Sequence, residues 1–489
     1  MDLQIEFKAG VPLRRQLEGA LRVAIRSGRL APGSSLPPSR DLADQLGISR
    51  GVVVDSYSQL ATEGYLTAKR GSGTRVALAP VPGTPPARRQ VRPPGRFRYD
   101  LRPGQADYHA FPRARWKASL MRALRELPDQ RLGYANHCGV AELRNAVAGY
   151  LARVRGVVVE PDQVVVCCAA SQALTVLWQV LRKQGACRVA IEDPGWRWQR
   201  YTVEHAGLEA VPVRVDADGM VVSDLAAADV DAVVMTPAHH YPTGVVMTAQ
   251  RRAALITWAR ERRALIVEDD YDVEYRFGRE PVASLQGLAP DLVAFVATTS
   301  KTLSPALRLA WMVPPAHLID DVENVLLVTG VTPPTLDQIA MASFIEDAAL
   351  ERHLRSMRRR YRAKRDVFID ALGRHLPEVR ERHRAGLHLL AWLPDSIDEH
   401  KTATRARLSG VGVHELHRHC TVQAPSPPAL LLGYALHTAP TRKHACSQHA
   451  QSGMPGRHRR ARKIAARQIV RCVQPRSTKD HRQESGQEP

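Results

Sequence analysis

Apolar positions in the segment VPLRRQLEGALRVAIRSGRL, residues 11–30, recur at the spacing of an α-helix. Four aliphatic residues share one face of the first predicted helix: Leu13, Leu17, Leu21 and Ile25. We expect a second short helix from Ser39, as its N-cap, to about Leu46, and a third helix over roughly residues 50–63. Gly47 allows a sharp turn between them, and Ser49 is placed to cap the third helix. Two short helices joined by a brief turn that contains glycine indicate a helix-turn-helix.

The pattern then changes to two short strands around a basic, glycine-rich tip, which is typical of a wing. In a helix-turn-helix the second helix enters the major groove with its N-terminal residues toward the base edges. Arg50 is therefore placed to contact guanine or phosphate, and Arg40 to hold the DNA backbone. Each arginine alone could equally be a solvated surface charge, but the whole arrangement favours binding of double-stranded DNA. The candidate DNA-binding residues are Arg40, Ser49, Arg50, Lys69, Arg70 and Gly71.

Proline and arginine dominate the next segment, residues 79–98. Proline is excluded from helix interiors and central strands, so we expect an extended, semi-rigid spacer. Its arginines could contact DNA phosphate, although a solvated linker is the simpler interpretation. The predicted winged domain thus covers residues 1–78 and is followed by a linker.

From about residue 99 onwards, short continuous apolar runs alternate with helical segments. Examples are QVVVCCAA, VDAVVMTPA, ALIVEDDYD and DLVAFVATTSK, each followed by polar residues. Such runs indicate a buried, mostly parallel α/β sheet, in which ligands bind beyond the carboxyl ends of the strands. Polar groups gather at five predicted strand ends: residues 168–171, 193–196, 239–244, 269–271 and 298–301. We expect a ligand site where these ends meet.

The composition fits a nucleic-acid-binding protein of two or three domains. The chain has 489 residues, a net charge of +20 and a pI near 10.1, which suggests a polyanionic partner. No apolar run reaches the roughly 20 residues that span a bilayer, and the N-terminus lacks the apolar core of a signal peptide. We therefore expect a cytoplasmic protein with no membrane partner. The seven cysteines form no CxxC pair and no zinc spacing, so reduced thiols and no metal site are expected.

The polar residues at the strand ends match the needs of a phosphorylated pyridine aldehyde. A lysine such as Lys301 forms a Schiff base with an aldehyde, and its amine is more nucleophilic when burial lowers its pKa. An aspartate keeps a pyridine nitrogen protonated, and a tyrosine can bind the ring hydroxyl. A phosphate is held by an arginine, hydroxyls and the amides at a helix start. Taken singly, each of these residues has an ordinary structural explanation; together, at successive strand ends, they indicate a cofactor site.

Two sets of motifs resemble known families. The segment "PLRRQL…AIRSGRLAPGSSLPPSRDLADQLGISRGVVVDSYSQLATEGYLTAKRGSGTRVA" resembles the winged helix-turn-helix of GntR-type bacterial transcription regulators. The segment "EDDY…TTSKTLSPALRLAW", with "EDPGW" and "HHYPTG", is similar to MocR-type regulators, a GntR subfamily with a fused aminotransferase-like domain. This resemblance covers residues 10 to about 436. It implies an α/β chain: a winged helix-turn-helix, then a large fold-type I domain dependent on pyridoxal 5′-phosphate, with a small C-terminal subdomain, over residues 99–436.

The resemblance also implies roles for individual residues. Lys301 would carry pyridoxal phosphate as a Schiff base, Asp269 would pair with the pyridine nitrogen, and Tyr271 would face the ring hydroxyl. Trp196 would stack on the ring. The groups near the phosphate would be Thr298, Ser300, Arg308 and the amides of Ala170 and Ser171. The partners implied are an operator on double-stranded DNA, an amine or amino-acid effector and a second copy of the chain in a homodimer. Nucleoid association of a cytoplasmic bacterial protein follows from operator binding.

Three departures weigh on function. Ala169 stands where relatives have glycine, which could crowd a backbone that needs positive φ. The segment PPALLLGYAL lacks the arginine that transaminases use for the substrate carboxylate. Trp198 stands where a second arginine is sometimes found, two residues after the stacking aromatic. A carboxylate effector would need another partner, for which Arg197 and Arg200 are the candidates. Residues 437–489 form an atypical basic tail, which we attribute to a reading-frame shift; a native tail that adds DNA affinity is the alternative.

These departures leave three functions open. The leading prediction is a regulator that binds pyridoxal phosphate and senses the cofactor or an amine, with at most a transaminase half-reaction. A working aminotransferase fused to a DNA-binding domain is the second. A regulator without cofactor, whose large domain serves only as a dimer scaffold, is the third.

Overall fold

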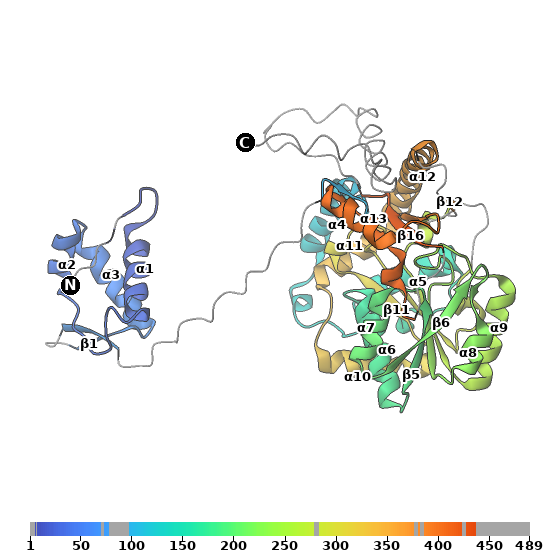
Figure 1. Ribbon diagram of the computed structural model, residues 1–489. Helices are drawn as coiled ribbons and strands as arrows, with labels where there is room; N and C mark the ends of the chain where they lie inside the picture. Colours follow the sequence, from blue (N-terminus) through green and yellow to red (C-terminus); the bar gives the residue numbers. More distant parts are fainter. Residues whose placement is uncertain are drawn as a thin grey trace, which may run out of the picture. The chain divides into compact units, whose positions relative to one another are not determined.

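The computed structural model describes residues 5, 7–69, 73–77, 97–277, 283–375, 380–381, 386–422 and 427–436. The chain divides into two compact units, Met1–Gly95 and Arg96–Pro489, which are described separately (Figure 1). The predicted linker over residues 79–98 lies almost wholly outside the described residues, as does the whole tail over residues 437–489. Both therefore stay predictions.

The first unit is a winged helix-turn-helix. Its helices are α1 (Leu13–Arg26), α2 (Ser39–Leu46) and α3 (Arg50–Thr62), and its wing is the antiparallel pair β1 (Leu66–Lys69) and β2 (Gly73–Val76). Of the aliphatic face predicted for α1, Leu17, Leu21 and Ile25 are buried and pack in one core with residues of α3. Leu13, at the start of the helix, is 39% exposed, so that part of the prediction is wrong. The helix periodicity of this segment is thus confirmed.

Three predictions about glycine and serine residues in this unit have different outcomes. Gly47 adopts a left-handed conformation with φ +64 at the end of α2, as the turn requires. The Ser49 hydroxyl caps α3 by accepting the amide N–H of Val52. The prediction that Ser39 caps α2 is wrong: Pro38 holds the N-cap position and Ser39 is the first helical residue. Proline there pre-sets the backbone angle, which leaves the Ser39 hydroxyl free to accept from the Arg50 guanidinium at 3.3 Å.

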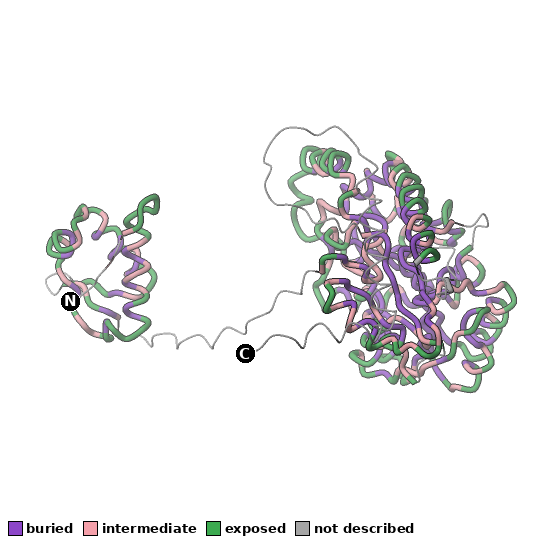
Figure 2. The backbone as a smooth tube through the Cα atoms, turned by 45° about the horizontal axis from the view of Figure 1, so that its top comes forward, coloured by how far each residue is buried: buried purple, intermediate pink, exposed green. Residues whose placement is uncertain are grey.

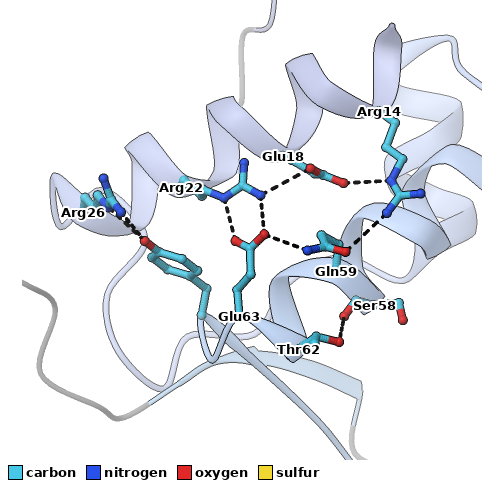
Figure 3. Close-up of polar contacts among 9 residues, drawn as sticks. Arg14, Glu18, Arg22, Arg26, Ser58, Gln59, Thr62 and Glu63 are labelled. Atoms are coloured by element: carbon cyan, nitrogen blue, oxygen red, sulfur yellow. Dashed lines mark hydrogen bonds and ion pairs between the residues drawn. The ribbon is translucent and has the colours of Figure 1, made fainter. Parts of the chain in front are cut away.

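A polar network joins α1 to the end of α3 (Figure 3). Two nitrogens of Arg22 donate to the two carboxylate oxygens of Glu63, each at 2.7 Å, and Arg22 also donates to Glu18 at 3.2 Å. Arg14 donates to Glu18 at 2.8 Å, one helical turn away. The Arg22 guanidinium lowers the pKa of Glu63 to about 2. Because one face of these helices is apolar and this edge is ionic, the network fixes how α1 lies against α3.

The second unit is built on an eight-stranded sheet in the order β4-β11-β10-β9-β8-β5-β6-β7. Strands β6, β5, β8, β9 and β10 are mutually parallel, whereas β11 and β7 run antiparallel to their neighbours. The strands are β4 (Val165–Cys167), β5 (Arg188–Asp193), β6 (Glu209–Asp216), β7 (Gly219–Met220), β8 (Ala232–Met235), β9 (Leu265–Asp270), β10 (Val293–Thr298) and β11 (Ala310–Val313). The buried, mostly parallel sheet predicted from the apolar runs is confirmed.

Helices cover both faces of this sheet, so the strands are buried while the helices carry the exposed surface (Figure 2). Along β10, Ala294 and Val296 pack toward α6 and α10, whereas Phe295 packs toward α5 and α11. This alternation is what a strand with two covered faces requires. The helices are α4 (Arg113–Glu126), α5 (Ala141–Arg155), α6 (Ala170–Lys183), α7 (Arg197–His205), α8 (Val222–Ala227), α9 (Ala249–Arg262), α10 (Ile319–Thr329) and α11 (Thr335–Glu346).

A small C-terminal subdomain completes the unit, with α12, α13 and β16 drawn in orange and red in Figure 1. It comprises α12 (Ala349–His375), α13 (Glu399–Leu408) and an antiparallel sheet β12-β13-β16-β15. The strands are β12 (Arg380–Glu381), β13 (His388–Trp392), β15 (His414–Glu415) and β16 (Ala429–Gly433), and a separate pair joins β14 (Val411–Gly412) to β3 (Tyr99–Asp100). None of the helices in the described residues is long and apolar enough to cross a membrane.

Candidate functional site

A cavity of about 550 Å³ lies at the carboxyl ends of the parallel strands of the second unit. Eight of the nine residues predicted for the cofactor line it: Ala170, Ser171, Trp196, Asp269, Tyr271, Thr298, Ser300 and Lys301. They come from the starts of α6 and α7 and the ends of β9 and β10. The volume falls in the usual range for small-molecule sites, roughly 300–1,000 Å³.

Lys301 lies three residues beyond the end of β10. Its amine donates to the carbonyl oxygen of Gly104 at 2.8 Å, and burial lowers its pKa although the charges of Asp272 and Asp269 oppose that shift. Gly104 has φ +76, and a β-carbon there would lie 3.3 Å from the Lys301 Nζ atom. Glycine at this position therefore leaves the lysine amine room to reach the cavity.

Asp269 lies on β9 and is only 2% exposed. One carboxylate oxygen accepts from the Gln199 amide at 3.0 Å, whereas the other, Oδ1, has no hydrogen-bond partner among the described residues. Burial raises the pKa of Asp269 to about 6, and the Gln199 hydrogen bond acts in the opposite direction. The carboxyl group thus has a vacant acceptor oxygen at the cavity wall, which a positively charged N–H donor would satisfy.

Tyr271 lines the cavity and belongs to a polar chain with His239 and Asp272, which are not among the lining residues. Its hydroxyl lies 3.0 Å from Nδ1 of His239, and the same nitrogen lies 2.8 Å from a carboxylate oxygen of Asp272. Burial raises the pKa of the Tyr271 phenol, so it stays protonated and can donate. Tyr241 packs edge-on against Tyr271, with ring centroids 6.0 Å apart, and lines the cavity as well.

Some of the residues predicted to lie near the cofactor's phosphate come together in the structure. The hydroxyl of Thr298 donates to that of Ser300 at 2.9 Å and accepts the Ser300 amide at 3.1 Å. Ala170 and Ser171 are the first two residues of α6, where helix amides lack carbonyl partners within the helix. The expectation that Ala169 crowds a positive-φ backbone is wrong, because its φ is −166, an extended conformation open to any residue.

Arg308 is the one predicted cofactor residue that does not line the cavity. It is exposed, with φ +52, after the short 3-10 helix η6 (Pro305–Leu307). Its positive charge nevertheless acts on the Cys168 thiol beside the start of α6, where it offsets the rise in pKa that burial causes. Its role toward a phosphate stays a prediction.

Several lining residues were not predicted from the sequence. Besides Gly104 and Tyr241 they include Tyr201, His414, Arg418 and His419. Arg197 also lines the cavity, while Arg200 lines an adjoining compartment. A signal existed in the basic and histidine-rich run HELHRHC, but only the fold brings this run from the small subdomain to the large one.

The candidate DNA-binding residues lie in the first unit. Arg40, Ser49 and Arg50 are exposed, the last two at the start of α3. Lys69 ends β1, whereas Arg70 and Gly71 lie outside the described residues. The exposed side of α3 also carries Val54, which is 45% exposed.

Comparison with known proteins identifies both units. Residues 13–76 match the family described as bacterial regulatory proteins, gntR family, and residues 101–447 match aminotransferase class I and II. The chain is 34% identical over 456 residues to the probable rhizopine catabolism regulatory protein MocR of Rhizobium meliloti, covering 88% of this chain and 92% of that one. It is also 34% identical to the pyridoxine biosynthesis transcriptional regulator PdxR of Corynebacterium glutamicum, covering 79% and 85%.

Solved structures support the fold of the second unit. An archaeal alanine:glyoxylate aminotransferase superposes with a TM-score of 0.66 at 20% identity, over 90% of this chain and 96% of that one. Proteins of this fold family generally use pyridoxal phosphate. The chain therefore belongs to the MocR-type family of GntR transcription regulators, in which a winged helix-turn-helix precedes an aminotransferase class I and II domain.

Proposed function

We propose that this regulator holds pyridoxal phosphate on Lys301 and changes its operator binding when an amine or amino acid enters the same cavity. One observation carries the proposal: a buried carboxylate oxygen of Asp269, which has no partner among the described residues, lies in the wall of the cavity that also receives the Lys301 amine. An unpaired buried acceptor is costly, so its retention points to a bound cation or donor.

The residues present fit the cofactor. The vacant Oδ1 of Asp269 suits a protonated ring nitrogen, and the Tyr271 phenol is a donor for a ring hydroxyl. The hydroxyls of Thr298 and Ser300 and the first amides of α6 suit a phosphate. Trp196 and Tyr241 supply aromatic walls on the same cavity.

When bound, pyridoxal phosphate supplies an aldehyde that reacts with amines and a ring that withdraws electrons. The chain's own residues prepare for this chemistry. Burial lowers the pKa of Lys301, which raises the share of neutral, nucleophilic amine. Asp269 would hold a proton at the ring nitrogen, and Gln199, which donates to its other oxygen, fixes the orientation of that carboxylate.

The sequence of β16 favours detection of an effector over steady turnover of a substrate. Its residues, Ala429–Gly433, offer no cation for a substrate carboxylate, which transaminases need for orientation. A working aminotransferase is the second candidate, because Lys301, Asp269 and Tyr271 form a set that catalysis would also use. We expect at most a single half-reaction.

The same proposal extends to DNA and to the assembly. Arg50 at the start of α3 would contact a base edge or phosphate in the major groove, with Arg40 on the backbone. Regulators of this kind act on two half-sites, so we propose a homodimer in the bacterial cytoplasm. Large exposed apolar side chains outside the cavity, Leu132, Tyr134, Val328 and Val331, suit burial by a second copy.

The test combines spectroscopy with DNA binding. Purified wild-type chain and Lys301→Ala are mixed with DNA from upstream of the protein's own gene, with and without pyridoxal phosphate and a panel of amines. We expect the wild type, but not Lys301→Ala, to show the cofactor's visible absorbance and to change its operator affinity when an amine is added. Continuous conversion of an amino acid and a keto acid would establish the enzyme instead. If wild type and Lys301→Ala show the same absorbance and the same response of operator affinity to amines, the proposal is contradicted.

A further inference from the structure

His239 and Asp272 form a buried pair behind the Tyr271 phenol. Their side chains are 2% and 1% exposed, and Nδ1 of His239 lies 2.8 Å from Oδ1 of Asp272. The same nitrogen lies 3.0 Å from the Tyr271 hydroxyl oxygen. Tyr271 lines the cavity, whereas His239 and Asp272 are not among its lining residues. The pair therefore meets the cavity through the Tyr271 side chain.

One nitrogen that faces two oxygens restricts the direction of both hydrogen bonds. A carboxylate accepts hydrogen bonds, so the close contact with Asp272 places the imidazole proton on Nδ1 of His239. This N–H is then shared between the Asp272 carboxylate and the Tyr271 oxygen. If Nδ1 instead accepted from Tyr271, its lone pair would face the carboxylate. Because the Tyr271 oxygen accepts from His239, its own O–H is not used in this bond.

The other ring nitrogen of His239 supports the same assignment. Nε2 of His239 is buried and has no hydrogen-bond partner among the residues that the structure describes. A proton on Nε2 would therefore be a buried N–H without an acceptor, which is rarer and costlier than a buried acceptor without a donor. With the proton on Nδ1, Nε2 is only an acceptor. Both nitrogens thus favour the tautomer in which His239 donates toward Tyr271.

The small subdomain packs closely against this pair. Gly386, two residues before β13, lies so near that a β-carbon there would be 2.1 Å from Cε1 of His239 and 2.8 Å from Oδ2 of Asp272. Its φ of +80 suits glycine, and its amide donates to the Tyr275 carbonyl oxygen at 3.1 Å. This packing restricts rotation of the imidazole away from Tyr271.

We propose that His239 and Asp272 are positioning residues that leave the Tyr271 O–H free to donate into the cavity, toward the ring oxygen of the cofactor. The inference rests on the proposed function for the identity of that acceptor only. Burial raises the pKa of the Tyr271 phenol, so the hydroxyl keeps its proton. An imidazole of the opposite tautomer would accept this proton and turn the O–H away from the cavity.

Ultraviolet resonance Raman spectra of the cofactor-free protein test the orientation. The intensity ratio of the tyrosine Fermi doublet is high for a phenol whose oxygen accepts and low for one that only donates. Each spectrum minus that of the same protein with Tyr271→Phe isolates Tyr271. We expect a high ratio in wild type and in His239→Asn, whose amide replaces the Nδ1–H, and a lower ratio in His239→Leu. His240→Leu is the matched control and should leave the ratio unchanged, because Nδ1 of that adjacent buried histidine contacts Thr243.

Equilibrium dialysis with pyridoxal phosphate tests the consequence for the cofactor. We expect His239→Leu to bind it about three- to tenfold more weakly than wild type, as loss of one hydrogen bond predicts, and His239→Asn to recover most of the affinity. In a Tyr271→Phe background, His239→Leu should cause no further loss, because the pair acts through the phenol oxygen. If His239→Leu does not fold, Asp272→Asn replaces it, because an amide no longer dictates where the imidazole proton lies.

Separate outcomes distinguish the two proposals. If wild type binds no pyridoxal phosphate, the proposed function fails, while the expected Raman ratio still supports the orientation of Tyr271. If wild-type Tyr271 gives the low ratio of a donor, or if His239→Leu leaves the ratio unchanged, the orientation is refuted whatever the cofactor does. Losses of affinity that add in the double variant would show that His239 supports the fold rather than the phenol, and would also overturn the inference.

Discussion

Replacing Asp269 with asparagine is expected to stabilise the protein without cofactor and to weaken its hold on pyridoxal phosphate. The carboxyl group is 2% exposed, and one of its oxygens has no partner among the described residues. Burial raises its pKa from 3.8 to about 6. A tenfold change in proton affinity is worth about 1.4 kcal/mol, so this rise costs about 3 kcal/mol of folding free energy at any pH above 6.

The direction of the pH dependence follows from the two pKa values. Between pH 4 and pH 6 the unfolded chain has released the Asp269 proton while the folded chain still holds it. The folded state of the wild type therefore loses stability as the pH rises through this window, and the loss is complete above about pH 6. Asparagine removes this contribution. Its amide can still accept from Gln199, but it leaves an unpaired N–H that costs about 1 kcal/mol.

The net effect of Asp269→Asn is thus a gain of about 2 kcal/mol at pH 8 and a loss of about 1 kcal/mol near pH 4. Thermal melts of cofactor-free protein at both pH values measure it, with Asp291→Asn as the control, because the Asp291 side chain is 64% exposed. Addition of pyridoxal phosphate should raise the melting temperature of wild type more than that of Asp269→Asn, because only binding to the folded state stabilises it. A variant that melts below wild type at both pH values would refute an uncompensated charge at Asp269.

Three further outcomes are expected. Lys301→Ala should lose the cofactor absorbance yet retain operator affinity in a gel-shift assay, because the DNA-binding unit is a separate compact unit. Arg50→Ala should weaken operator binding about tenfold and flatten its salt dependence by about one phosphate contact, measured by fluorescence anisotropy at several salt concentrations. Arg22→Gln should lower the unfolding free energy of the winged unit by about 1 kcal/mol in urea denaturation, since Arg22 bridges Glu18 and Glu63.

Strand ends could be found from the sequence because periodicity and burial are local signals. The run ALIVEDDYD predicts a strand that ends on acids, and β9 does end at Asp270, with Asp269 in the cavity wall. In a parallel sheet the carboxyl ends lie side by side, so residues far apart in the chain could be grouped without knowing any distance. Eight of the nine cofactor residues were found together for this reason.

The residues that escaped prediction depend on contacts between distant segments. Gly104 reaches the Lys301 amine from a segment 197 residues earlier, and nothing in its local sequence indicates that approach. Arg418 and His419 belong to the small subdomain, whose arrangement over the large sheet is set by packing. Ser39 shows the opposite failure: a local cap signal was overridden by the adjacent proline.

The charged residues that line the cavity come from two parts of the second unit, and this bears on how a ligand could influence the rest of the chain. Asp269 and the Lys301 amine belong to the large domain, whereas Arg418 and His419 belong to the 3-10 helix η8 (Leu416–His419) of the small subdomain. A ligand that bonds only to Lys301 gains nothing from the position of the small subdomain, and so cannot shift its equilibrium. A ligand that also contacts Arg418 or His419 gains free energy only in arrangements that bring both parts within its length. Contacts with both parts therefore provide the differential affinity that an allosteric response requires, and amines that also contact the small subdomain should change the operator affinity most.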